Sequence, residues 1–266
     1  MLTELRKMPI FALLLYLNIS YCFAHGDAQY LGNSAVLVES KGKKVLFDPF
    51  FHNDFGVYQL VPQHLQQAII RGEAPYDDID LIVISHAHED HFSALDVANY
   101  LQRFPKTKLI APQQAIDLLK EYNLTASQLI GFDLSFNAPP QSKQVAELIV
   151  QAVRIPHAGW PARKDVQNIV FRIELGDAFS AMHMGDADPN DDHYLPYKTH
   201  WQNHETSVNF PPYWFFMSLE GRDILNEILQ VEQHIGVHVP KEIPQFLKHS
   251  SYPYFSIPGE RRQFHK

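Results

Sequence analysis

The chain has 266 residues, of which 45% are hydrophobic, and it carries a formal net charge of −8 at pH 7. This length and hydrophobic share are enough for one sizeable core, so we expect a single domain rather than two small ones. The acidic balance argues against a general nucleic-acid-binding protein, because such a protein needs a basic surface.

The first residues, 1–24, have the pattern of a secretory signal peptide. Two basic residues precede an apolar run that is too short for a comfortable membrane span, and a small-x-small cleavage pattern ends at Ala24. We therefore expect an exported chain, periplasmic or secreted, in which residues 25–266 form one domain without a stable membrane anchor. The only cysteine, Cys22, would leave with the signal, so the mature chain would form no disulfide and would hold any metal through nitrogen and oxygen.

The first half of the expected mature chain predicts an alternation of strands and helices. Apolar runs at 35–38 and 44–47 flank a glycine-containing turn and predict a β-hairpin. Alternating elements follow: a helix over 61–71 that ends at Gly72, a strand over 81–84, a helix from a Ser93 capping box to Arg103, a strand that begins at 109 and a helix from Pro112 to about Tyr122. This order is typical of an α/β fold.

The second half predicts mostly strands. They are expected over 128–134, 145–155, 169–175 and 179–184, and a helix over 219–231 leads into a short strand over 234–239; the tail 252–263 is expected to add an edge strand. Two broadly similar halves, each of strands followed by helices, are compatible with this order.

The segment Ser-His-Ala-His-Glu-Asp-His, residues 85–91, directly follows the apolar strand expected at 81–84. Its first two histidines, His86 and His88, are two positions apart, so on an extended backbone their imidazoles point to the same side. Asp90 and His91 add an oxygen and a nitrogen at the next step. An isolated histidine is usually a surface or core residue, but four donors within six residues suit a divalent metal ion, and more than one ion.

Further metal donors stand where later strands are expected to end. His157 follows an apolar strand, Asp186 follows the strand over 179–184, and His238 lies at the end of the strand over 234–239. Each alone is readily an ordinary loop or turn residue, and only together with the first cluster do they indicate a site. His183 lies inside a strand, which favours a structural or supporting role, and His234 stands at the start of its strand, which ranks it below His238.

Aromatic and histidine-rich segments leave alternatives open. His193, His200 and His204 lie in a polar, aromatic loop, where they either are solvated or contact a substrate. The ring-rich segment 210–216 either packs in the core or lines a pocket.

The order of these donors resembles the five-motif pattern of the metallo-β-lactamase superfamily, over roughly residues 29–262. The resemblance implies an α/β (α+β) fold, a four-layer αββα sandwich with the site where the two sheets meet. It implies one metal on His86, His88 and His157, a second on Asp90, His91 and His238, Asp186 as a bridge between them, and Asp48 as a supporting residue. One departure is Gly32-Asn33-Ser34, where relatives often carry Gly-His.

The chemistry expected from such a site is metal-dependent hydrolysis of a small-molecule substrate. Two Zn²⁺ ions per chain, with iron or manganese as alternatives, would activate a water for attack on an ester, lactone, amide or phosphodiester, and Asp90 would help the proton transfer. Two rivals remain: an iron-dependent redox enzyme on the same ligands, and an exported metal-binding protein without turnover.

Overall fold

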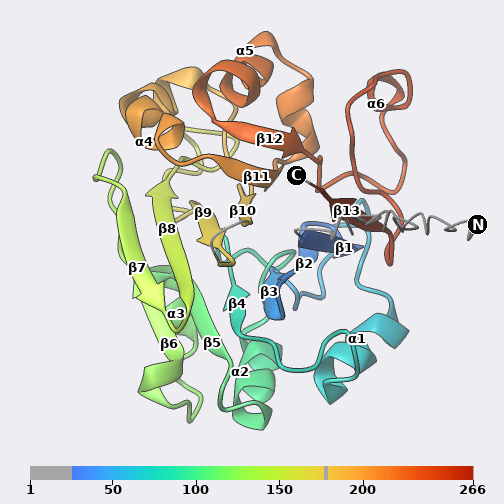
Figure 1. The fold of residues 1–266 in the computed structure, drawn as a ribbon, viewed down its shortest axis with the longest axis vertical. Coiled ribbons are helices and arrows are strands. Elements are labelled where there is room, and N and C mark those ends of the chain that lie inside the picture. Colours follow the sequence, from blue (N-terminus) through green and yellow to red (C-terminus); the bar gives the residue numbers. More distant parts are fainter. Residues whose placement is uncertain (1–25, 177–178, 266) are drawn as a thin grey trace, which may run out of the picture.

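Two mixed β-sheets lie face to face between two layers of helices in the computed structural model, which describes residues 26–176 and 179–265 (Figure 1). The expected signal peptide, residues 1–24, lies outside the described residues. Among the described helices, none is both long and apolar enough to cross a membrane. The α/β class and the sandwich of two sheets expected from the sequence are confirmed.

The first sheet has seven strands in the order β13-β1-β2-β3-β4-β5-β6. Neighbours run antiparallel from β13 to β3 and parallel from β3 to β6. The strands are β1 (Gly26–Gly32), β2 (Ala35–Ser40), β3 (Lys43–Phe47), β4 (Leu81–Val83), β5 (Lys108–Pro112), β6 (Leu129–Phe132) and β13 (Arg261–Phe264).

The second sheet has six strands in the order β12-β11-β10-β9-β8-β7. Neighbours run antiparallel from β7 to β10 and parallel from β10 to β12. The strands are β7 (Gln141–Val145), β8 (Leu148–Arg154), β9 (Ile169–Glu174), β10 (Ser180–His183), β11 (Thr206–Phe210) and β12 (Val231–His234).

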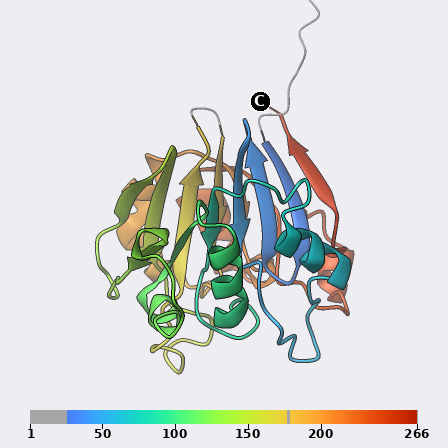
Figure 2. The same cartoon turned by 90° about the horizontal axis from the view of Figure 1, so that it is seen from below.

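Helices cover the outer face of each sheet. The first sheet is covered by α1 (Gln63–Arg71), α2 (Ala94–Arg103) and α3 (Gln113–Leu118), which stand in front of the strands in Figure 2. The second is covered by α4 (Lys198–Gln202), α5 (Leu219–Asp223) and the π-helical turn Ile224–Ile228, and α6 (Gln245–Lys248) lies near the C-terminal end of the chain.

Alternating side chains along the strands build three apolar layers. In β4, Leu81 and Val83 face the core between the two sheets, whereas Ile82 faces the helices of the first sheet. In β9, Phe171 joins the same central core and its neighbour Val170 joins the layer under α4 and α5. Each sheet is therefore buried on both faces, which holds the strand ends in fixed positions.

The predicted helix boundaries near the first cluster are confirmed. The Ser93 side chain accepts a hydrogen bond from the backbone N–H of Asp96 and caps α2, which ends at Arg103 as expected. Gly72 ends α1 in the left-handed conformation, with φ of 68°. The hairpin of β2 and β3 is also present.

Several expected elements are corrected by the structure. The strand expected over 145–155 is present as β8 but begins only at Leu148, because a turn with Ala146 at φ of 52° separates it from β7. The helix expected to reach Tyr122 ends at Leu118 and continues as turns. Strands β1 and β11 were not predicted. In β11 the polar side chains are buried, and Oγ1 of Thr206 accepts a hydrogen bond from Arg172.

The expected helix over 219–231 and strand over 234–239 are also wrong at their junction. The helical segment ends at Ile228, and β12 already begins at Val231, where it pairs with β11. Residues 235–239 form only isolated bridges, at Gly236 and Val237. The sequence pattern misled here because β12 reads Val-Glu-Gln-His and has little apolar character, whereas the apolar run begins only after it, at Ile235.

Candidate metal centre

The predicted donors come together at one edge of the sandwich, where strand ends of both sheets meet. The segment with His86 follows β4 of the first sheet, while His157 and Asp186 follow β8 and β10 of the second. Backbone hydrogen bonds join the last two loops, since the N–H of Ala158 donates to the carbonyl of Asp186 at 2.7 Å. His238 follows β12, and its N–H donates to the carbonyl of Asn33 at 2.9 Å.

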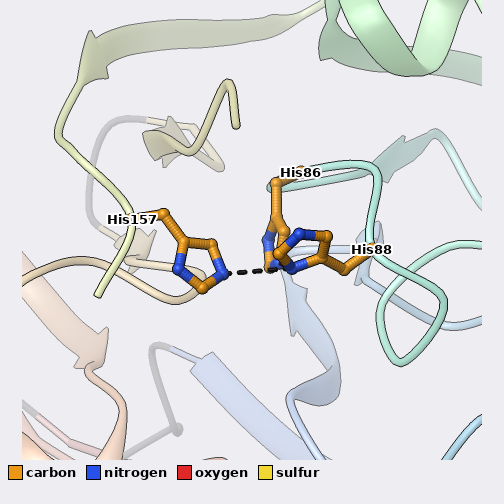
Figure 3. A group of neighbouring side chains, drawn as sticks. All are labelled: His86, His88 and His157. Carbon is orange, nitrogen blue, oxygen red and sulfur yellow. Dashed lines mark hydrogen bonds between the residues drawn. The ribbon is translucent and has the colours of Figure 1, made fainter. Parts of the chain in front are cut away.

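Three imidazoles form the first donor group (Figure 3). Nδ1 of His88 lies 3.1 Å from Nε2 of His86 and 3.1 Å from Nε2 of His157. Nitrogen ligands in a tetrahedral zinc site, each about 2.0–2.1 Å from the metal, are about 3.3 Å apart. The three nitrogens therefore converge at the spacing that a single ion requires.

Two carboxylates and two imidazoles form the second donor group, Asp90, His91, Asp186 and His238. Nε2 of His238 lies 3.2 Å from Oδ2 of Asp90 and 3.3 Å from Oδ1 of Asp186, and Nε2 of His91 lies 3.1 Å from the same Oδ1. The fourth imidazole–carboxylate pair, Nε2 of His91 and Oδ2 of Asp90, is 3.6 Å apart. These separations again match the ligand spacing of one small cation.

Asp186 lies between the two groups. Its Oδ1 faces His91 and His238, whereas its Oδ2 lies 3.4 Å from Nε2 of His157 in the first group. One carboxylate thus presents a separate oxygen to each group, which is the geometry needed for a bridging ligand.

Buried atoms without partners mark where a cation fits. Nε2 of His91 and Oδ1 of Asp186 are buried and have no hydrogen-bond partner among the described residues. Leaving such atoms unsatisfied costs free energy in a protein interior, and a cation between them removes that cost. The set contains nitrogen and oxygen donors only, which suits zinc, iron or manganese.

Supporting hydrogen bonds fix which nitrogen three of the imidazoles present. Nδ1 of His91 lies 2.8 Å from Oδ2 of Asp48, which leaves Nε2 free to face the donor group. Ser85 donates its hydroxyl to the same Asp48 oxygen at 2.6 Å and lies 3.0 Å from Nδ1 of His86. His157 donates from Nδ1 to the carbonyl of Ala158 at 2.7 Å. Such outer contacts orient metal-ligating histidines.

Two buried asparagines, for which the sequence predicted no role, also support the donors. Asn33 donates to the carbonyl of Asp90 at 2.9 Å and holds a left-handed conformation with φ of 46°. Asn168 accepts the N–H of Asp186 at 2.9 Å. The departure from Gly-His at Asn33 was the available signal, whereas nothing in the sequence around Asn168 distinguishes it.

The pKa shifts differ between the imidazoles of the first donor group and the carboxylate of Asp186 in the second. Burial, together with the neighbouring imidazoles, lowers the pKa of His86 well below its usual value and that of His88 to about 4. Burial would by itself raise the pKa of Asp186, but the imidazoles of His238 and His91 outweigh it and lower that pKa well below its usual value. His86 and His88 thus stay unprotonated and Asp186 keeps its negative charge, as metal binding requires.

The other histidines lie outside the two donor groups. His183 is buried, and its Nε2 donates to the carbonyl of Ser34 at 2.9 Å. Its Nδ1 lies 3.9 Å from Oδ2 of Asp48. His234 donates from Nε2 to the carbonyl of Leu225 at 3.0 Å and lines a different cavity from the donor groups. The rings of His200 and His204 lie 4.6 Å apart between centroids and are tilted by 43°, and neither residue belongs to a donor group.

A cavity of about 620 Å³ opens over the donor groups. Its lining includes His88, Asp90, Asp186 and His238 together with Phe55, Tyr58, Ala87, Glu89 and Arg163. The ring-rich segment 210–216 does not line it: Phe215 and Phe216 are buried in the core, and the Trp214 ring packs 5.2 Å from that of His238. The aromatic walls come instead from Phe55 and Tyr58, in a loop to which the sequence analysis gave no role.

Comparison with known proteins identifies the family. The model of the Beta-lactamase superfamily domain matches residues 27–198, which is more than half of the chain. The chain therefore belongs to the metallo-β-lactamase superfamily, as the sequence motifs indicated. A UPF0173 metal-dependent hydrolase from Aeropyrum pernix is 32% identical over 92 residues, which are 35% of this chain and only 32% of that protein's length.

Solved structures share the fold at low sequence identity. Igni18, a metallo hydrolase from the archaeon Ignicoccus hospitalis, is 21% identical with a TM-score of 0.62, and the match covers 91% of this chain and 99% of that one. CmlA, a diiron beta-hydroxylase from Streptomyces venezuelae, is 11% identical with a TM-score of 0.52, covering 92% of this chain and 55% of that one. These likenesses support the four-layer sandwich and leave the reaction open.

Proposed function

We propose that the chain is a metal-dependent hydrolase that binds two zinc ions, one at each donor group, with Asp186 between them. The observation that carries this proposal is the spacing of 3.1–3.6 Å between donor atoms within the groups, together with the two oxygens of Asp186 that face different groups.

A pair of divalent cations supplies an activated water at neutral pH and stabilises a developing negative charge on the substrate. The residues of the chain hold and orient this chemistry. Asp48 and Ser85 keep the imidazoles of His91 and His86 in the required orientation. Asp90 lines the cavity with its carboxylate fixed by Asn33, so it is the residue that we assign to proton transfer.

The proposed substrate is a small molecule with an ester, lactone, amide or phosphodiester bond. The cavity volume of about 620 Å³ is within the range of small-molecule sites. Its lining combines the ring surfaces of Phe55 and Tyr58 with charged groups, which suits a substrate that has both an apolar and a polar part.

Iron-dependent redox chemistry is the second candidate. The donor set contains no sulfur and so fits iron as well as zinc. CmlA, which shares the fold, is itself a diiron beta-hydroxylase. Metal analysis of protein purified from unsupplemented cells distinguishes the two candidates, because the redox proposal requires iron in place of zinc.

The decisive experiment combines metal quantification with a panel of chromogenic esters, lactones, β-lactams and phosphodiesters. We expect zinc-dependent turnover of at least one class, and loss of that turnover in His88→Ala. Activity that survives in His88→Ala would show that the hydrolysis comes from elsewhere. A fully metal-loaded protein without turnover on any class would favour a metal-binding protein.

We also propose that the chain is exported after removal of residues 1–24. The support is the basic, apolar and small-residue pattern of this segment. N-terminal sequencing of protein from the cell envelope tests it: a mature chain that begins at His25 is expected, and an intact Met1 terminus would contradict export.

A further inference from the structure

One permanently cationic side chain lines the cavity over the donor groups. This residue is Arg163, in the loop that joins β8 to β9, six residues after His157. Among the described lining residues, the charged ones besides Arg163 and the histidines are carboxylates: Asp90 and Asp186 belong to the second donor group, and Glu89 accepts a hydrogen bond from Asn53 at 2.9 Å.

The Arg163 side chain lies beside the backbone of Gly159. A Cβ atom at Gly159 would lie 3.5 Å from Cδ and 3.6 Å from Nε of Arg163, so the arginine lies in contact across this glycine. The backbone of Gly159 has φ of +90°, a conformation that other residues rarely adopt. The arginine therefore lies against the loop that carries His157, at a position two residues after that ligand.

Tyr58 lines the same cavity as Arg163. Burial raises the pKa of the Tyr58 hydroxyl, the carboxylates of Asp186 and Asp90 add to this, and the positive charge of Arg163 acts in the opposite direction. The Tyr58 ring packs edge-on against the imidazole of His238, with 4.0 Å between centroids. Tyr58 thus lies against a donor imidazole, in the cavity that Arg163 also lines.

Arg163 has no partner of its own within the described part of the chain. No carboxylate lies within ion-pair distance of its guanidinium, and no side-chain hydrogen bond from it is present. Other arginines have structural contacts: Arg154 donates to the carbonyl of Leu134 at 2.8 Å, and Arg172 donates to Oγ1 of Thr206 at 2.9 Å. An unpaired guanidinium beside a cavity is well suited to a planar anion, which it can bind through two parallel hydrogen bonds.

We propose that Arg163 determines specificity by binding an anionic group of the substrate, a carboxylate or a phosphate, while the bond to be hydrolysed lies over the donor groups. This inference rests on the proposed hydrolase function for its kinetic consequence, but the anion binding itself does not depend on turnover. Phe55 and Tyr58 provide apolar surface for the remainder of the substrate.

Lys164 provides a matched control for this charge. It is the next residue in the same exposed loop, carries the same charge and does not line the cavity. Arg163→Gln and Lys164→Gln therefore change the net charge of the loop equally, and only the first removes the group that faces the cavity.

The binding experiment uses the zinc-loaded full chain and calorimetric titration. The three probes are carboxylates that differ in their second anionic group. Butyrate has none, succinate has a second carboxylate, and 3-phosphonopropionate has a phosphonate. We expect Arg163→Gln to weaken binding of at least one doubly anionic probe about tenfold relative to the unsubstituted protein, and to leave butyrate unchanged. The probe that loses more identifies the preferred group, and Lys164→Gln should leave all three unchanged.

The kinetic experiment uses 4-nitrophenyl butyrate and mono-4-nitrophenyl succinate, which share a leaving group. We expect Arg163→Gln to raise KM for the succinate ester about tenfold, with little change in kcat and an unchanged KM for the butyrate ester. Arg163→Lys, which keeps the charge and loses the planar fork, should recover part of the affinity.

The outcomes separate the two proposals. If the chain hydrolyses the esters but Arg163→Gln matches the unsubstituted protein in both experiments, the role of Arg163 is wrong and the hydrolase stands. If no ester is hydrolysed but the binding preference is lost only in Arg163→Gln, the hydrolysis of esters is wrong and anion binding stands. Equal losses in Arg163→Gln and Lys164→Gln would also overturn the inference, because the effect would then be one of general charge.

Discussion

Gly185 offers the sharpest test of how the fold supports the donor groups. It is buried directly before Asp186 and has φ of +56°, the left-handed region. A Cβ atom at this position would lie 2.4 Å from Oδ1 of Asn168 and 2.7 Å from Cβ of Ser85. Both neighbours hold donors, since Asn168 accepts the N–H of Asp186 and Ser85 bonds Asp48 and contacts His86.

Gly185→Ala should therefore destabilise the chain through two effects. The left-handed conformation costs a residue with a Cβ about 1–2 kcal/mol, and overpacking a well-filled interior costs about 1–3 kcal/mol more. Gly42→Ala is the matched control, because Gly42 has φ of +77° and nothing within 4 Å of its Cβ position. The control has the conformational cost alone, and any loss of entropy in the unfolded chain is common to both variants.

The assay is urea unfolding of metal-free protein followed by circular dichroism, with the free energy of unfolding obtained by linear extrapolation. We expect Gly185→Ala to be less stable than Gly42→Ala by about 1–3 kcal/mol, and to bind zinc more weakly. Equal stabilities of the two variants would refute the close packing of Gly185 against Asn168 and Ser85.

Three further predictions concern the supporting residues and pH. Asp48→Asn should weaken zinc affinity about 10–100-fold, because the carboxylate that orients His91 is lost. Chelator competition measures this affinity, and an unchanged affinity would show that Asp48 does not support the site. Asn33→Ala should release the backbone of Asp90 and lower zinc affinity without loss of secondary structure, which the same competition and circular dichroism would check. In the metal-free chain the pKa of His88 is about 4, below the ~6.5 of an exposed imidazole, so the folded state binds fewer protons between these values and stability falls as the pH drops through this range. The denaturation midpoint, measured from pH 7 to 4, should decline less steeply in His88→Gln than in the unsubstituted protein, and parallel curves would contradict this role of His88.

The first donor cluster was recoverable from sequence because its geometry is local. His86 and His88 follow a short buried strand, and the order of donors within 85–91 sets their relative positions. His157 and Asp186 were found by the rule that strand ends meet at one edge, which depends only on β8 and β10 being strands.

His238 was expected in the right place for an incomplete reason. No regular strand precedes it directly, since β12 ends at His234 and the following residues form isolated bridges. Its position depends on a left-handed backbone, with φ of 59°, and on the hydrogen bond from its N–H to Asn33. Both are tertiary features, and a strand pattern does not contain them.

The cavity walls were beyond the reach of sequence reasoning. Phe55, Tyr58 and Arg163 belong to two loops that are far apart in the chain and come together only in the folded structure. The ring-rich segment 210–216 had the stronger local signal, but Phe215 and Phe216 are used in the core. Composition can identify aromatic segments, whereas which of them faces a cavity is decided by packing.

The metal content of the purified chain tests the central claim most directly. Elemental analysis after zinc reconstitution and removal of loosely bound metal should give two zinc ions per chain, because two groups of donors at ligand spacing share Asp186. The same measurement on Asp186→Ala should give a lower ratio. One ion or none per unsubstituted chain, or a ratio unchanged in Asp186→Ala, would contradict the dinuclear site.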